Sequence, residues 1–237
     1  MSEWKAKRFW SNASVDETAD GFGVRLDHRV LRTPAKSELR LPTRAMAQAV
    51  ADEWMAQEDE VKPLSMPVTR AANAAIDKVA VQFDEVAEML AAYGDSDLLC
   101  YRADSPVELV ARQAEAWDPL LDWADKTFKA RLLPRTGLIH VPQETTSLSR
   151  LSAQVHKQTA FQLAAFHDLV SLSGSLVIGL AAIHDVAPVE TLWRLSRIDE
   201  DWQEEQWGED DEATQLANSK RASFLNANHF FNLTRSA

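Results

Sequence analysis

The chain has 237 residues, of which 46% are hydrophobic and 26% are charged, so a folded core is expected rather than disorder. The 36 acidic residues outnumber the 25 basic ones and give a net charge of −11, which argues against nucleic acid as the main partner because phosphate binding needs a basic face. The one cysteine, Cys100, excludes an internal disulfide, and the longest apolar stretch, residues 169–183, is too short to span a membrane. The first residues carry no hydrophobic signal segment, and we expect a soluble intracellular protein.

Residues 8–42 show the pattern of a small antiparallel β unit. Apolar and other residues alternate over 22–26, which is the period of a half-buried strand. The dipeptide at 27–28 can turn the chain, so that 30–33 returns as a partner strand, and 38–41 alternates as a third short strand. An isolated hairpin is marginal in water, so this unit must pack against the rest of the protein.

From Thr43 onward the pattern becomes helical. Thr43 is a suitable N-cap for a first helix, and a second helix is predicted over residues 68–93 and expected to end at Gly94. Pro106 is expected to open a third helix with a kink or restart at Asp118-Pro119. Residues 131–144 read as a loop with a short extended piece.

The last 90 residues are the most helical part of the chain. One apolar stripe is formed by Leu148, Leu151, Val155, Thr159, Leu163, Phe166 and Val170. A short buried helix is predicted over 173–183, a helix that begins at Pro188 reaches Trp202 and stops at Gly208, and a final helix begins at Glu209. The predicted fold class is α+β, with a small N-terminal β domain (1–43) followed by an α-helical domain (44–237).

Motifs for catalysis are largely absent. Gly21-Phe22-Gly23 lacks the third glycine of a dinucleotide site, no phosphate-binding loop is present, and the six histidines show no metal-ligand spacing. Cys100 lies in an apolar run and reads as a buried small residue. Asp95-Ser96-Asp97 could hold a metal, although a turn with helix caps is the preferred interpretation. We predict no catalytic residue, no metal and no cofactor.

Two features remain unusual, namely the tryptophans and an acidic run. Of the eight tryptophans, Trp4 and Trp10 fall outside any helical stripe, and Trp202 and Trp207 lie within the acidic run, so these four are interface candidates. The acids of the run are Asp199, Glu200, Asp201, Glu204, Glu205, Glu209, Asp210, Asp211 and Glu212. Those from 209 onward favour a helix start, whereas the acids of 199–205 are expected near the end of their helix, where the macrodipole disfavours them. Both a solvated face and a docking surface for a basic partner remain open.

Several segments together resemble the assembly chaperones that hold the unassembled α subunit of F1-ATP synthase. They are Arg8-Phe9-Trp10, residues 24–36, Leu41-Pro42-Thr43, Glu53-Trp54, residues 63–70, Ala75-Ile76-Asp77, residues 97–103, Gln113, residues 117–120, Asp199-Glu200, Trp202-Gln203 and Trp207-Gly208. The match depends on their number and order. One departure is His28-Arg29-Val30, where the family usually has Gly-Arg-Pro, so the hairpin turn is expected to differ.

The resemblance implies a two-part fold and a function without catalysis, in which the protein binds free α subunit, shields its β-facing surface and releases it during hexamer assembly. We expect the partner-binding residues to be Asp199, Glu200, Trp202, Gln203, Trp207 and Glu212. The free protein is expected to be monomeric, with no membrane insertion, in a bacterial cytoplasm or, alternatively, as a mature mitochondrial form.

Two other functions stay open at this point. One is a small enzyme with a cleft between the β unit and the helices that uses Cys100 or His140 with a nearby carboxylate. The other is an acidic adaptor for a different basic partner, which selectivity for the α subunit would separate from the chaperone.

Overall fold

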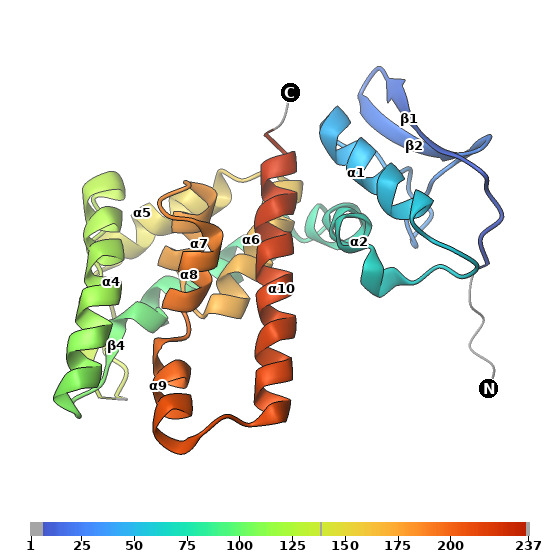
Figure 1. Ribbon diagram of the computed structural model, residues 1–237. Helices are drawn as coiled ribbons and strands as arrows, with labels where there is room; N and C mark the ends of the chain where they lie inside the picture. Colours follow the sequence, from blue (N-terminus) through green and yellow to red (C-terminus); the bar gives the residue numbers. More distant parts are fainter. Residues whose placement is uncertain (1–6, 138, 236–237) are drawn as a thin grey trace. The chain divides into compact units, whose positions relative to one another are not determined.

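The computed structural model describes residues 7–137 and 139–235, which form two compact units (Figure 1). One unit contains the described residues of 7–83, 160–165 and 229–235, and the other contains those of 84–159 and 166–228. A small antiparallel sheet followed by helices confirms the predicted fold class. The boundary after residue 43 stays a prediction.

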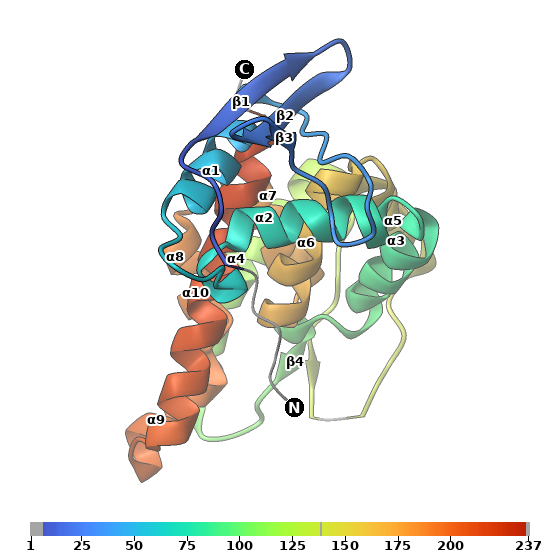
Figure 2. The same ribbon diagram turned by 90° about the vertical axis from the view of Figure 1, so that its right-hand side faces the viewer.

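The sheet contains β1 (Ala13–Thr18), β2 (Gly21–Leu26) and β3 (Arg29–Val30) in that order, all antiparallel (Figure 2). The predicted strand over 22–26 is therefore confirmed. The return strand is present but covers Arg29–Val30 rather than 30–33, and β1 was not anticipated. Residues 38–41 form single bridges rather than a strand. The positive φ of the turn, 52°, falls on Asp27, so the position of His28 does not require glycine.

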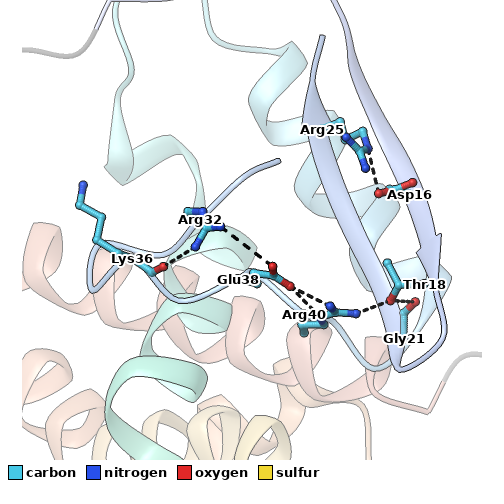
Figure 3. A network of polar contacts seen from close by, with 8 residues as sticks. All are labelled: Asp16, Thr18, Gly21, Arg25, Arg32, Lys36, Glu38 and Arg40. Carbon is cyan, nitrogen blue, oxygen red and sulfur yellow. Dashed lines mark hydrogen bonds and ion pairs between the residues drawn. The ribbon is translucent and has the colours of Figure 1, made fainter. Parts of the chain in front are cut away.

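Polar contacts connect β1 and β2 to the segment that follows the sheet (Figure 3). Arg25 pairs with Asp16 across β1 and β2 at 2.8 Å, and Arg40 donates to the Thr18 hydroxyl at 2.7 Å. Arg40 also pairs with Glu38 at 2.7 Å. Both arginines are therefore paired with acids of the same unit. Because these ion pairs are half-exposed, each contributes little to the stability of the fold.

Helix α1 (Arg44–Met55) packs on β1 and β2, and the Thr43 hydroxyl accepts a hydrogen bond from the Met46 amide, as a helix cap does. Trp10 is 4% exposed, lies edge-to-face with Trp54 and donates to the Trp54 carbonyl. The hypothesis that Trp10 contributes to an interface is therefore wrong, because its ring is in the core. Trp4 lies outside the described residues.

The helix predicted over 68–93 is broken into several pieces. After the 3-10 turn η1 (Pro63–Ser65) come α2 (Pro67–Ala74), the π-helix η2 (Ala75–Val79), α3 (Phe83–Ala91) and the 3-10 helix η3 (Ala92–Ser96). Tertiary contacts explain the break, since Asp77 in the π-helix accepts from the Thr33 hydroxyl and the Ala35 amide. Gly94 lies within η3, where an added Cβ would be 3.2 Å from Leu176, so close packing requires glycine there.

Helix α4 (Val107–Phe128) begins directly after Pro106, as predicted, but it runs through Pro119 without a restart. Asp118 does not cap a new helix because its carboxylate accepts from Arg102 at 2.7 Å. The Glu115 carbonyl loses its helical partner at Pro119, and burial of Trp117 and Leu120 holds the helix in place.

The expected extended piece in the loop after α4 is present. Strand β5 (Arg135–Thr136) pairs in parallel with β4 (Tyr101–Arg102), which follows the 3-10 turn η4 (Leu98–Cys100).

The apolar stripe over 148–170 is divided between α5 (Thr145–His156) and α6 (Ala160–Ser173). Helix α7 (Leu176–Ile183) is buried at every position, as predicted, and Ser175 caps it. The helix expected from Pro188 to Gly208 is two helices, α8 (Val189–Leu195) and α9 (Ile198–Trp207), and α10 (Asp211–Leu233) ends the fold. In the described part of the chain no helix combines the length and the apolarity that crossing a bilayer would need.

Candidate partner-binding groove

A groove of about 710 Å³ lies within the second unit, between α4 and α9, which contact each other. Figure 1 shows where these two helices run. One wall comes from β4, the segment after it and the first turns of α4, and the other comes from α9. Its main lining residues are Tyr101, Arg102, Ala103, Asp104, Ser105, Pro106, Leu109, Gln113, Asp199, Trp202, Gln203, Gln206 and Trp207. The groove therefore joins segments almost a hundred residues apart in the sequence.

Gln113 connects the two walls. Its side chain is buried, its Nε2 donates to Asp199 Oδ1 at 2.6 Å, and its Oε1 accepts from the Ala103 amide at 2.8 Å. One turn later in α4, the Trp117 indole donates to the Leu195 carbonyl just before α9 begins. A buried amide with both ends satisfied fixes the geometry of the site, because either wall could move only by breaking a buried hydrogen bond.

Four of the six predicted partner-binding residues line this groove: Asp199, Trp202, Gln203 and Trp207. Trp207 is 80% exposed, which is unusual for a residue with so large an apolar surface. Glu200 is exposed on α9 and Glu212 is exposed on α10, and neither lines the groove. The structure brings the four together but leaves untested whether any of the six binds a partner.

The expected position near a helix end is wrong for Asp199, Glu200 and Asp201, whereas Glu204 and Glu205 do lie in the last turn of α9. Because the chain breaks at residues 196–197, Asp199, Glu200 and Asp201 occupy the first turn of α9, where the helix dipole favours negative charge. Arg197 also faces several of these acids and lies 3.0 Å from Glu204, 3.6 Å from Asp201 and 3.7 Å from Glu200. Much of the acidic run therefore has a structural explanation.

Burial raises the pKa of Asp201 above its ordinary value, and the nearby Arg197 guanidinium acts against this shift. Arg112 on α4 pairs with Glu205 at 2.7 Å. After these pairs are assigned, Asp104, Asp199 and Glu212 have no ion pair with any residue in the described ranges. Two of these carboxylates line the groove and one lies at the start of α10, while other described acids, such as Glu108 and Glu115 on α4, also have no ion pair within these ranges.

Cys100 is poorly suited to nucleophilic catalysis. Burial, with a smaller effect from Asp97, raises the pKa of its thiol to about 12, so the reactive thiolate does not form near neutral pH. His140 is exposed, and its ring nitrogens lie 3.2 Å from Asp95 Oδ2 and 3.2 Å from the Tyr101 hydroxyl. Over residues 7–137 and 139–235, no three His, Cys, Asp or Glu side chains gather as metal ligands would.

Asp97 has a capping role, as preferred from the sequence. Its buried carboxylate accepts from the Ser175 hydroxyl at 2.7 Å and from the amides of Leu99 and Val177 at 3.0 Å each. Burial raises the pKa of Asp97 to about 6, and these hydrogen bonds limit the rise. The carboxylate thus joins the start of η4 to the start of α7.

Sequence reasoning missed the wall formed by Tyr101, Pro106 and Leu109, and on α9 it also missed Gln206. The interpretations of Asp97 as a cap and of Cys100 as a buried residue both hold, but neither indicates that Tyr101 lines the groove. No local pattern marks this wall, because it becomes a site only when α9 packs against α4.

Comparison with known proteins gives one consistent result. The family model described as ATP12 chaperone protein matches residues 7–125. The protein Atp12, mitochondrial, of Schizosaccharomyces pombe is 24% identical over 224 residues, which cover 90% of this chain and 77% of that protein. The crystal structure of an Asp-to-Lys mutant of Paracoccus denitrificans Atp12p has a TM-score of 0.96 at 50% identity and covers 99% of this chain and 100% of that one. The Atu1473 protein from Agrobacterium tumefaciens has a TM-score of 0.92 at 40% identity, over 95% of this chain and 85% of that one.

Proposed function

This chain belongs to the ATP12 chaperone protein family, and from that premise we propose that it binds the free α subunit of F1-ATP synthase and releases it when the hexamer forms. It is a chaperone for ATP synthase assembly. The choice of the α subunit, the surface that is shielded and the absence of catalysis are parts of the proposal.

The physical reason for such a chaperone is the surface of an unpaired subunit. A subunit that normally sits in a ring exposes a large apolar interface when it is alone, and this surface promotes aggregation. A cover for it must also be displaced later, which favours a contact of moderate area with polar groups at its rim.

The observation that carries the proposal is the groove between α4 and α9. It combines two tryptophans, one of them 80% exposed, with two carboxylates that lack an ion pair among the described residues. Tryptophan is enriched among the residues that dominate binding energy, and unmatched surface charge selects partners of opposite sign. Glu200 and Glu212 would add charge beside the groove.

Co-purification tests this function directly. The tagged protein is mixed with free α subunit, with free β subunit and with assembled F1 in parallel. We expect selective capture of free α, which stays soluble at concentrations where it precipitates alone. Equal capture of β, or capture of neither subunit at low and moderate salt, would contradict the proposal.

The proposal also includes a monomeric free form in a bacterial cytoplasm. The two solved relatives with 40–50% identity come from bacteria, while the fission yeast relative is named as mitochondrial. Light scattering during gel filtration should give a mass near that of one chain, and a mass twice as large would rule out the monomer.

A further inference from the structure

We propose that the groove receives an arginine side chain of the unassembled α subunit, with its guanidinium stacked on Trp202 or Trp207 and paired with Asp104 or Asp199. This inference rests on the proposed function and adds the chemistry by which the partner is recognised.

The two groove tryptophans differ from the other tryptophans in the described part of the chain. Each of the others has a ring or cation contact: Trp10 with Trp54, Trp117 with Arg102, Trp123 with Phe128 and Trp193 with Phe224. Trp202 and Trp207 have neither kind of contact with any described residue. Neither indole ring in the groove therefore has an aromatic or cationic partner among the described residues.

Two carboxylates also line the groove, together with Arg102, whose guanidinium already pairs with Asp118 at 2.7 Å. Asp104 and Asp199 come from opposite walls, and no described cation pairs with either of them. Asp199 accepts only the neutral Gln113 amide, which holds the carboxylate in place without cancelling its charge. Aromatic faces with carboxylates alongside form a site for an organic cation.

Arginine fits this chemistry better than lysine. Its planar guanidinium can stack on an indole ring while it donates two parallel hydrogen bonds to a carboxylate, and it is more weakly hydrated than an ammonium group. The same fold already uses this contact, since Arg102 lies 5.3 Å from the Trp117 ring centre and also donates to Asp118.

The experiment uses intact free α subunit. It is treated with an arginine-selective dicarbonyl reagent, alone and in complex with this protein, and the modified arginines are identified by mass spectrometry. Trp207→Leu and Asp104→Asn serve as groove variants, and they are combined with Trp202→Leu and Asp199→Asn, respectively, so that both rings and both carboxylates are tested. Glu108→Gln is the matched control for Asp104→Asn, because it removes the same charge from an exposed position four residues away that does not line the groove.

We expect at least one arginine of α to be protected by the wild type and by Glu108→Gln but not by the groove variants. Lysine at that position of α should weaken binding about 3- to 30-fold. A stable complex in which no arginine depends on the groove would overturn this inference and leave the proposed function standing. Failure of the complex to form under any condition would overturn both.

Discussion

Asp97 and Asp199 are both aspartates at the start of a helical segment, yet their surroundings give them opposite roles. Asp97 is fully buried and accepts three hydrogen bonds that join η4 to α7. Asp199 lies in the first turn of α9, accepts one hydrogen bond from Gln113 and faces the groove. The difference shows that the number of donors around a carboxylate, rather than its place on a helix, decides whether it stabilises the fold or remains available to a partner.

The largest expected effect on stability follows from removing the side chain of Asp97, the buried one of the two aspartates. Asp97→Ala leaves the amides of Leu99 and Val177 and the Ser175 hydroxyl buried without an acceptor. We expect the free energy of unfolding to fall by about 3 kcal/mol or more in urea denaturation. Asp104→Ala, at an exposed position, should change the free energy of unfolding by less than about 0.5 kcal/mol. Equal effects of the two variants would contradict the contrast between a buried and an exposed aspartate.

The pH dependence of stability sharpens the comparison. The pKa of Asp97 rises from 3.8 to about 6 on folding, so the native state holds a proton that the unfolded chain has already lost. This contribution to stability is fully present below about pH 4 and is lost as the pH rises through about 6. The difference in unfolding free energy between wild type and Asp97→Asn should decline by about 1.4 kcal/mol per pH unit in that window. A flat difference would mean that Asp97 is ionised throughout.

A smaller cost is expected in the helix that Asp97 helps to anchor. A Cβ at Gly179 in α7 would lie 2.6 Å from Val170 Cγ2 and 3.1 Å from Phe166 Cε2. Gly179→Ala should therefore lower the unfolding free energy by about 1–3 kcal/mol despite the better helix propensity of alanine. A stabilised variant in thermal melts would show that these neighbours move aside easily.

Substitutions of exposed residues in and beside the groove should have almost no effect on the stability of the fold. Trp207→Ala and Glu212→Lys replace exposed side chains, so we expect unfolding free energies within about 0.5 kcal/mol of wild type. Capture of free α should nevertheless weaken in both. Glu88→Lys, an exposed charge reversal on α3, is the matched control and should leave capture unchanged. Loss of helical circular dichroism in the Glu212 variant would mean that this acid is structural.

The sequence predicted the features that local chemistry determines. Thr43 caps α1, Pro106 precedes α4 and Gly208 ends α9, because each has a residue type suited to that backbone position. The break at 196–197 has no such signal. Neither residue at this break, Ser196 or Arg197, is a glycine or a proline, and the helical spacing of apolar residues continues across them. The sequence pattern therefore predicts one helix where the structure has two.

That missed break also changed the interpretation of the candidate site. Asp199, Glu200 and Asp201 were predicted near a helix end, where negative charge is unfavourable, but they lie at a helix start, where it is favourable. Arg197 also forms ion pairs with several acids of α9. The tryptophans of α9 were predicted to bind a partner because large apolar rings among charges are conspicuous in a sequence, and both line the groove. The opposite wall was missed because it depends on packing between α4 and α9, to which no short pattern corresponds.

The bridge made by Gln113 has a kinetic consequence. Both walls of the groove are held by part-buried hydrogen bonds of Gln113 without any partner, so binding of a subunit as proposed would order little of this protein. The residence time of a subunit bound in this way would then depend on its contacts within the groove. A competing subunit that removes one of these contacts would shorten it.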